Sequence, residues 1–274
     1  MPERAKTPDR SGPRPRPPQR SRRQDARVFA ATVVAVREVT PHMRRITVTA
    51  PEVAGYAPLG PDEYLGLLMP RDDEAPLVLP AEDGGDNIRA AVAAIPEEHR
   101  PDLRWYTLRA HRPSAAEIDI DMVVHGDEGP GTRFARRAHP GSVLGIREAA
   151  ALYAPAPDAR TRLLVGDESS LPAIARILET TGSVRTAVFI EIADERERQD
   201  LPGDVVWVPR GDERPGAPLA RALRTAVLPD PVDYAWVCGE RGGVQEIRRQ
   251  LVEHGVPKDR ITFSGYWRLG EPRG

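Results

Sequence analysis

The stretch TRLLVGDESSLPAIARILETTG, residues 161–182, decides the fold of the second half of the chain. Its first part, TRLLVGDE, predicts an apolar strand, and SSLPAIARILETTG predicts a helix that begins at serine and ends at Gly182. Further strands are predicted at 184–193, 204–210, 234–240 and 260–267, and further helices at 217–228 and 242–255. Apolar strands that alternate with helices indicate a parallel α/β sheet covered on both faces.

The first half of the chain has a different hydrophobic periodicity, with short segments that alternate between apolar and polar residues. Strands are predicted at 27–40, 42–50, 63–70, 103–111 and 117–126, and another at the end of GPGTRFARRAHPGSVLGI. Residues 71–102 contain many Pro, Gly and acidic residues, which indicates an insertion or a long loop around a short helix. Short strands joined by Pro and Gly turns predict an antiparallel barrel.

The hydrophobic pattern changes near residue 155, and the segment APAPDART at this place is typical of a linker. We therefore expect a barrel domain at 27–155 and an α/β domain at 156–274. The Pro- and Arg-rich residues 1–26 have almost nothing to bury, so they are predicted to be a disordered tail.

The overall composition excludes several classes of protein. No apolar run reaches membrane-spanning length, so no membrane insertion is expected. The net charge of −2 argues against a dedicated nucleic-acid binder. The single cysteine, Cys238, excludes an intramolecular disulfide and a cluster ligated by four thiolates, and the six histidines lack ligand spacing, so no metal site is predicted. A reducing, cytoplasmic compartment fits this cysteine usage.

The strand RWYTLRAH, residues 104–111, contains a candidate ligand-binding face. Arg104 and Tyr106 project from the same side of a strand. An arginine fork suits a pyrophosphate, and a tyrosine ring about 7 Å further along can lie against a flat heterocycle. Thr107 points to the opposite side, so it reaches the same ligand only if the strand bends there.

A second candidate is GPGTRFA, residues 129–135, where a glycine turn leads into a helix. The exposed N–H groups of such a helix start attract phosphate. The alternative is an ordinary helix start with Thr132 as its cap. His125 lies between the two candidates, and on its own a histidine that ends a strand is more often structural than catalytic.

Taken together, these segments resemble the siderophore-interacting proteins, a branch of the ferredoxin-reductase-like flavoproteins that reduce ferric siderophores. The resemblance is carried by RWYT, VVHG, GPGTRFA and PG in that order, and then by DESSLPAIARILE and GYWRLGE. It covers roughly residues 27–271. It implies a six-stranded antiparallel Greek-key FAD-binding barrel, followed by a parallel-sheet α/β domain similar to NAD(P)-binding domains.

The resemblance also implies roles for individual residues around FAD. Arg104 would hold the phosphates, Tyr106 would pack on the flavin, and Thr107 would hydrogen-bond the edge of its ring. The flavin and ribityl chain would be lined by Val123, Val124 and His125, and the pyrophosphate received by Gly129, Gly131 and Thr132. Two residues depart from the family pattern: Gly131 stands in place of alanine, which is expected to be harmless, and Phe134 in place of tryptophan.

The α/β domain should bring the reductant, but it contains no G-x-G-x-x-G motif. Asp167 and Glu168 occupy the first strand-to-helix turn and would repel a phosphate unless they turn away. The segment Cys238-Gly239-Glu240 is a candidate guide for a nicotinamide, or else a buried strand end with a tight turn. Tyr266 and Trp267 are expected to cover the flavin or line the substrate mouth, although core aromatics would give the same pattern.

These features predict an FAD-dependent reductase that reduces Fe(III) in a ferric siderophore to Fe(II) and releases iron in the cytosol. NADH or NADPH is the expected electron donor, with ferredoxin as an alternative, and a monomer is expected. An anionic chelate calls for a basic mouth, for which the candidates are Arg44, Arg45, Arg241 and Arg268. Two other functions remain open: a general flavin or ferredoxin-type reductase for another acceptor, and a siderophore-binding protein without reductase activity.

Overall fold

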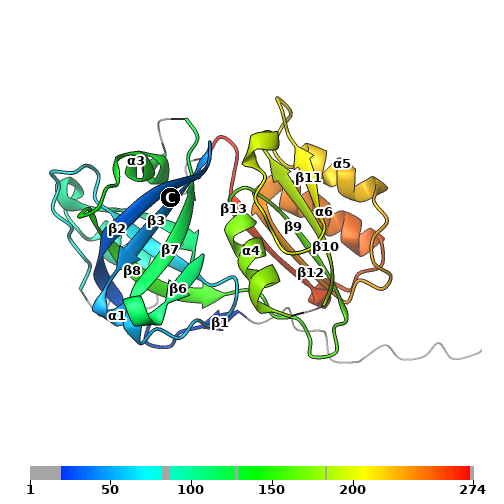
Figure 1. Ribbon diagram of the computed structural model, residues 1–274, viewed down its shortest axis with the longest axis horizontal. Helices are drawn as coiled ribbons and strands as arrows, with labels where there is room; N and C mark the ends of the chain where they lie inside the picture. Colours follow the sequence, from blue (N-terminus) through cyan, green and yellow to red (C-terminus); the bar gives the residue numbers. More distant parts are fainter. Residues whose placement is uncertain (1–19, 82–86, 127–128, 183, 272–274) are drawn as a thin grey trace, which may run out of the picture.

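The computed structural model describes residues 20–81, 87–126, 129–182 and 184–271. Figure 1 shows two domains side by side, an antiparallel barrel and a parallel sheet with helices. The barrel ends with β8 and the parallel sheet begins with β9 ten residues later, at Thr161. No helix in these ranges is both long and apolar enough to span a bilayer.

The barrel consists of eight strands, all antiparallel to their neighbours. They are β1 (Ser21–Arg22), β2 (Val28–Thr40), β3 (Met43–Thr49), β4 (Tyr64–Met69), β5 (Asp102–Thr107), β6 (Ala110–Arg112), β7 (Glu117–Val123) and β8 (Val143–Ala151). The order is β5-β4-β8-β2-β3-β7-β6, with β1 added on β8. Because β5 and β6 follow each other in the chain, the path closes on itself.

The strands β5 and β6 are two halves of one bent strand, which pairs with β4 on one side and with β7 on the other. Counted in this way, and without the short β1, the barrel has the six strands that the sequence predicts. The interruption falls directly after Thr107, the place where a bend was expected if Thr107 is to reach the same ligand as Arg104 and Tyr106. The consecutive strands β3 and β4 are not neighbours, as in a Greek key.

The tail prediction is wrong for residues 20–26. Ser21 and Arg22 pair with Ala151 and Ala150 of β8, and the guanidinium of Arg23 lies 4.3 Å from the centre of a tyrosine ring. Pairing with an existing strand edge overrides the low hydrophobicity of this segment. Residues 1–19 lie outside the described residues.

The described residues of the barrel domain also form three α-helices and two 3-10 helices: α1 (Pro51–Ala54), α2 (Ile88–Ala93), α3 (Pro130–Arg137), η1 (Glu97–His99) and η2 (Pro113–Ala115). The helix α2 covers an outer cluster with Leu68, whereas α3 contributes Phe134 to the barrel core. Alternate strand residues fill this core, among them Val33, Ile46, Val48, Leu65, Leu67, Ile118, Ile120, Met122, Leu144 and Ile146.

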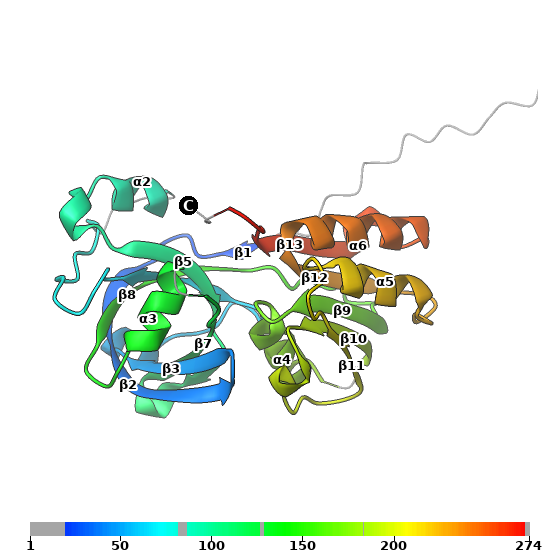
Figure 2. The ribbon, with the colours of Figure 1, turned by 90° about the horizontal axis from the view of Figure 1, so that it is seen from above.

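The second domain is a five-stranded parallel sheet in the order β11-β10-β9-β12-β13. Its strands are β9 (Thr161–Asp167), β10 (Arg185–Ile192), β11 (Val205–Pro209), β12 (Tyr234–Glu240) and β13 (Ile261–Trp267). The helices are α4 (Leu171–Thr180), α5 (Ala217–Thr225) and α6 (Arg241–Glu253), with short 3-10 helices η3 (Glu195–Glu197) and η4 (Lys258–Arg260). Figure 2 shows α4 on the barrel side of the sheet and α5 and α6 on the other side, as predicted. The strand order reverses between β9 and β12, which is where open α/β sheets bind ligands.

Buried polar contacts fix how the two domains sit against each other. The indole N–H of Trp236 donates to the carboxylate of Asp62 at 2.8 Å, and the same carboxylate accepts from the backbone of Leu152 at 3.0 Å. On α4, Arg176 donates to the backbone carbonyl oxygen of Leu108 at 2.8 Å. Since these groups are buried, moving one domain away from the other would leave unsatisfied donors and acceptors.

Candidate functional site

The side of β5 that faces α3 presents an arginine without an acidic partner. Alternation places Asp102, Arg104 and Tyr106 on this side. Asp102 pairs with Arg133 of α3 at 3.2 Å, and the ring of Tyr106 reaches Gly131 of the same helix. Arg104 lies on β5 between these two contacts with α3. Its guanidinium donates to the carbonyl oxygen of Leu103 at 2.7 Å and forms no ion pair with any described residue. A free cation therefore lies beside the start of a helix.

The ring of Tyr106 packs on the first turn of α3, where position 131 has no side chain. A β-carbon built on Gly131 would lie 1.7 Å from the hydroxyl oxygen of Tyr106 and 3.0 Å from its Cζ. Glycine at this position is therefore not only tolerated but needed, since the tyrosine uses the space. Burial raises the pKa of Tyr106 to about 12, against the charge of Arg104, so the phenol is neutral at physiological pH.

The start of α3 keeps its backbone donors available. Its N-cap is Gly129, and no side chain of the described residues caps the helix. Thr132 is not the cap, because its hydroxyl donates to the carbonyl oxygen of His125 at 3.3 Å. The N–H groups of Gly131 and Thr132 belong to the first turn, where an α-helix offers no internal acceptor. They are suited to an anion.

The segment after β7 has mixed exposure. Val123 is half-buried and His125 is exposed, whereas the side chain of Val124 lies in the barrel core. The N–H of Val124 donates to the carbonyl oxygen of His42 at 2.8 Å. The side chain and the N–H of Val124 are therefore already engaged. Thr107, at the end of β5, is buried.

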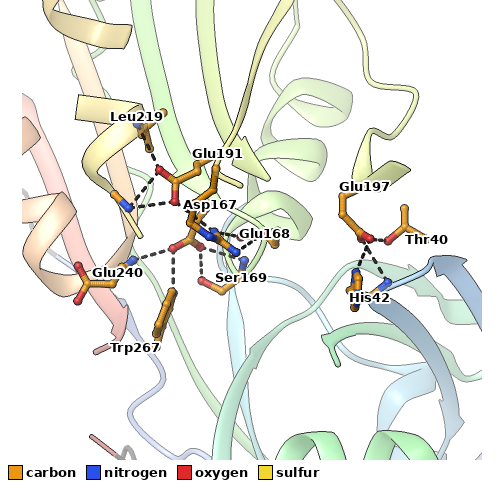
Figure 3. Close-up of polar contacts among 12 residues, drawn as sticks. Thr40, His42, Asp167, Glu168, Ser169, Glu191, Glu197, Leu219, Glu240 and Trp267 are labelled. Atoms are coloured by element: carbon orange, nitrogen blue, oxygen red, sulfur yellow. Dashed lines mark hydrogen bonds and ion pairs between the residues drawn. The ribbon is translucent and has the colours of Figure 1, made fainter. Parts of the chain in front are cut away.

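At the carboxyl end of the parallel sheet, Asp167 accepts four hydrogen bonds (Figure 3). One oxygen accepts from the indole N–H of Trp267 at 2.8 Å and from the backbone of Glu240 at 2.7 Å, and the other from Ser169. Burial raises the pKa of Asp167, and the hydrogen bonds oppose this effect. The carboxylate thus turns inward, as phosphate binding at this turn would require.

Glu168 also turns aside, toward Arg210 at 3.1 Å. The same guanidinium pairs with the buried Glu191 at 3.1 Å, and Glu191 accepts from the backbone of Gly216 at 2.9 Å. These acidic residues hold the loop between β11 and α5.

The segment 238–240 forms a buried strand end with a tight turn, and its suggested role in guiding a nicotinamide remains a prediction. Gly239 has φ +148°, and a β-carbon there would lie 2.6 Å from an oxygen of Asp167. Glu240 caps α6 by accepting from Gly243 N–H at 2.8 Å. Burial raises the pKa of the Cys238 thiol well above its usual range, so it is not a thiolate.

Both aromatic residues at the end of β13 pack within the α/β domain. The ring of Tyr266 meets Trp236 edge-on at 6.3 Å, and Trp267 is held by Asp167. A contact of either residue with a flavin remains a prediction.

The four arginines proposed for the substrate mouth are engaged to different degrees. Arg45 is bound to Asp121 at 2.6 and 2.7 Å, and Arg44 donates to two carbonyl oxygens at the end of α3 at 3.0 and 3.1 Å. Arg268 pairs with Glu271. Arg241, the first residue of α6, is exposed and has no partner among the described residues.

A further exposed cation, Arg214, lies next to Arg241. A β-carbon built on Gly242 would lie 2.4 Å from its guanidinium, so Arg214 extends over the start of α6. Its guanidinium forms no hydrogen bond or ion pair within the part of the chain that the structure describes. Arg214 was not among the predicted site residues, because RGDERPG has the composition of an ordinary turn.

A last polar group joins the two domains near Val124 (Figure 3). The buried carboxylate of Glu197 accepts from the hydroxyl of Thr40, and lies 2.7 Å from Nδ1 of His42. The ligand atoms of His42, Glu197 and Asp194 all lie within 4.8 Å of one another. No spacing in the sequence reveals this group, because about 150 residues separate His42 from the two acidic residues.

Comparison with known families gives two matches that together span most of the chain. Residues 32–151 match the family described as "Siderophore-interacting FAD-binding domain", and residues 159–270 match "Siderophore-interacting protein". The boundary between the matches falls between β8 and β9.

Several characterised proteins are similar over nearly their whole length. The ferric vibriobactin reductase ViuB of Vibrio cholerae is 30% identical over 255 residues, which are 89% of this chain and 92% of the relative. The NADPH-dependent ferric-chelate reductase of Escherichia coli is 26% identical over 92% of this chain and 97% of the relative. The crystal structure of a siderophore utilization protein from T. fusca is 31% identical, with a TM-score of 0.79 over 92% of this chain and 97% of that chain.

Proposed function

The chain belongs to the siderophore-interacting protein family, and on this basis we propose that it is an FAD-dependent reductase of ferric siderophores. The reaction converts chelated Fe(III) into Fe(II) with electrons from NAD(P)H. Two relatives that carry names of ferric reductases support this activity. The observation that carries the proposal is the free guanidinium of Arg104 beside the uncapped start of α3.

The residues around α3 fit the adenine dinucleotide of a flavin. A pyrophosphate needs positive charge and N–H donors, which Arg104, Gly131 and Thr132 offer at one place. The neutral ring of Tyr106 offers an apolar face on the same side of β5. We propose that these residues hold FAD together with Thr107, Gly129 and the backbone of residues 123–125.

The reductant is proposed to bind at the carboxyl ends of β9 and β12. Asp167 and Glu168 are engaged elsewhere, so they leave this edge open to a phosphate. Arg214 extends over the start of α6, and its guanidinium can pair with the phosphates of NADH or NADPH. The relative from E. coli is named as NADPH-dependent, which favours NADPH. Ferredoxin is the alternative donor.

When bound, FAD supplies the ability to accept two electrons and to pass them on singly. One NAD(P)H therefore provides the electrons for two ferric ions. Fe(II) is a poorer match than Fe(III) for the hard oxygen donors of a siderophore, so reduction eases release. For one-electron transfer, about 59 mV of driving force changes the equilibrium tenfold. The part of this chain is to position the two reactants and to bind their negative charges.

For the substrate we propose that Arg241 contributes to binding an anionic chelate at the mouth. Arg268 can join it by leaving its exposed partner, since surface ion pairs are weak. Arg44 and Arg45 are committed to α3 and to Asp121, so they contribute charge rather than direct contacts. A monomer in the cytosol completes the proposal, in keeping with a buried, unpaired cysteine.

The test is to load the full chain with FAD and to mix it without oxygen with NADH, NADPH or reduced ferredoxin while following flavin bleaching. A ferric siderophore is then added, and Fe(II) is counted with a ferrous chelator. We expect bleaching by NADPH and then two Fe(II) per flavin. A colourless protein that takes up no FAD but binds the siderophore would instead be a binding protein. Faster turnover with a quinone than with the iron chelate would indicate a general reductase.

A further inference from the structure

The turn between β2 and β3 meets the loop after β10 at a group of three metal-binding side chains. His42 comes from the barrel, and Asp194 and Glu197 come from the α/β domain. In Figure 3 the imidazole of His42 points at the carboxylate of Glu197. The three ligand atoms, one nitrogen and two oxygens, lie within 4.8 Å of one another.

We propose that His42, Asp194 and Glu197 form a binding site for a divalent transition metal, whose occupant is the Fe(II) that leaves the reduced chelate. The identity of the occupant depends on the proposed function, whereas the site itself does not. No spacing in the sequence indicates this site, because its residues meet only when the domains dock.

The donor set selects for the reduced ion. Imidazole and carboxylate suit Fe(II), and three such ligands on one side of an ion leave positions open for water. A siderophore offers hard oxygen donors, which hold Fe(III) more tightly than Fe(II). Reduction therefore weakens the binding of iron by the siderophore, but it does not weaken binding by His42, Asp194 and Glu197.

The distances require little change to admit an ion. His42 Nδ1 and Glu197 Oε1 are 2.7 Å apart, whereas two ligands at right angles around such a metal lie about 3 Å apart. An ion can thus replace the proton shared by this pair after a small opening. The side chain of His42 is 45% exposed, so an ion can reach the pair from solvent.

Asp194 can turn toward the ion. One carboxylate oxygen caps η3 by accepting from the backbone N–H of Arg196 at 2.8 Å and also accepts from its side chain at 3.0 Å. The other oxygen accepts from the side chain of Arg196 at 2.8 Å, and since this side chain is 71% exposed the pair contributes little, so this second oxygen can serve the ion. Glu197, in contrast, is fixed. Its other oxygen accepts from the hydroxyl of Thr40 and from the backbone of His42 at 3.3 Å, contacts that orient a ligand.

The position of the group suits the capture of the product. The carbonyl oxygen of His42 accepts from Val124 N–H, within the segment 123–125 that we propose for the flavin. Asp194 and Glu197 follow the carboxyl end of β10, the edge at which parallel sheets bind their ligands. Iron that is released beside the proposed flavin segment is therefore close to these three side chains.

The site is tested by titrating the full chain with Co(II) and with Fe(II) in the absence of oxygen. We expect one ion per chain, with the visible bands of Co(II) bound to nitrogen and oxygen. His42→Ala and Asp194→Asn should each weaken binding at least tenfold. Neither substitution removes the contact between Thr40 and Glu197 that helps to join the domains. The control is His254→Ala, an exposed histidine at the end of α6, which should bind as the wild type does.

Absence of Co(II) and Fe(II) binding would overturn the site, as would equal binding by His42→Ala, Asp194→Asn and the wild type. The occupant is tested by one turnover with a ferric chelate followed by rapid gel filtration. The wild type should retain close to one Fe(II), and the two variants should reduce at the same rate but retain none. Reduction without retention by the wild type overturns Fe(II) as the occupant. If the wild type does not reduce the chelate, the proposed function is wrong, and so is the assignment of Fe(II) as the occupant. The Co(II) titration still shows whether the metal site exists.

Discussion

The hydroxyl of Tyr106 lies over the α-carbon of Gly131, in space that any side chain at position 131 would fill. An added β-carbon would lie 1.7 Å from the hydroxyl oxygen. Gly131 lies inside α3 with ordinary helical geometry, so its glycine is needed for space and not for backbone freedom. The tyrosine that we propose for the flavin and the helix that we propose for its phosphates are therefore positioned by one contact.

Gly131→Ala should force Tyr106 away and weaken FAD binding by about 1–3 kcal/mol, the usual effect of overpacking. FAD affinity is measured by fluorescence titration, and stability by urea unfolding. Tyr106→Phe removes the atom that clashes most, so the double variant should lose less than the sum of the single losses. Strictly additive losses would show that the two residues do not share this space.

Arg104→Ala should weaken FAD binding by roughly 2 kcal/mol, about 30-fold in Kd, because a charge-assisted contact to phosphate is lost. Arg104 has no ion pair among the described residues, so the stability of the FAD-free protein should change little. The control is Arg37→Ala, which removes an equal charge from an exposed position of β2. Unchanged FAD affinity in Arg104→Ala would refute the assignment.

The fold and the proposed flavin residues could be predicted because their signals are local. Alternating strands, a bend after Thr107 and a glycine turn at 129–131 all lie within short segments. Contacts between domains gave no such signal. The bond of Trp236 to Asp62 and the pair of His42 with Glu197 join residues 174 and 155 positions apart, and their geometry depends on how the domains dock. The strand β1 was missed because its partner, not its composition, makes it a strand.

Deletion of residues 1–19 should leave stability and FAD binding unchanged, whereas deletion of residues 1–26 should lower stability by about 2–3 kcal/mol. The longer deletion removes Arg23, which pairs at 3.2 Å with Glu63, a residue with no solvent exposure. Glu63 would keep its hydrogen bonds from Tyr56 and from the backbone of Leu59, but a buried carboxylate that loses its cationic partner is costly. Thermal unfolding of both truncations, with Arg23→Ala in the full chain, measures the effect. Equal melting temperatures for all variants would contradict it.

Arg214→Ala should raise the KM for NADPH roughly tenfold, about 1.4 kcal/mol, with little change in kcat. Arg214 lies free over the start of α6, so its loss removes binding charge without breaking an internal contact. The matched control is Arg221→Ala, on the exposed surface of α5, where the guanidinium pairs with Glu213. Steady-state kinetics with both NADPH and NADH also show whether Arg214 recognises the 2′-phosphate. NADH lacks this group, so its turnover should be unaffected by Arg214→Ala if the arginine binds the 2′-phosphate.

Asp119→Asn should lower stability near pH 7 by about 2 kcal/mol, and this difference should disappear in acid. Burial alone would raise the pKa of Asp119, but hydrogen bonds from Arg112 and Thr47 outweigh it, so the pKa is lowered. Arg112 donates to both carboxylate oxygens, at 2.6 and 2.8 Å.

A carboxyl group with a lowered folded-state pKa stabilises the fold at pH values above its unfolded pKa of about 3.9. This contribution is lost as the pH falls through the folded-state pKa, because the proton then neutralises the partner of Arg112. The neutral acid resembles asparagine in shape, so wild type and Asp119→Asn should converge in stability as the pH falls below the lowered folded-state pKa. Urea unfolding between pH 3 and 7 measures the difference, with the exposed Asp25→Asn as the control. A constant difference across this range would mean that packing, and not the ion pair, makes Asp119 important.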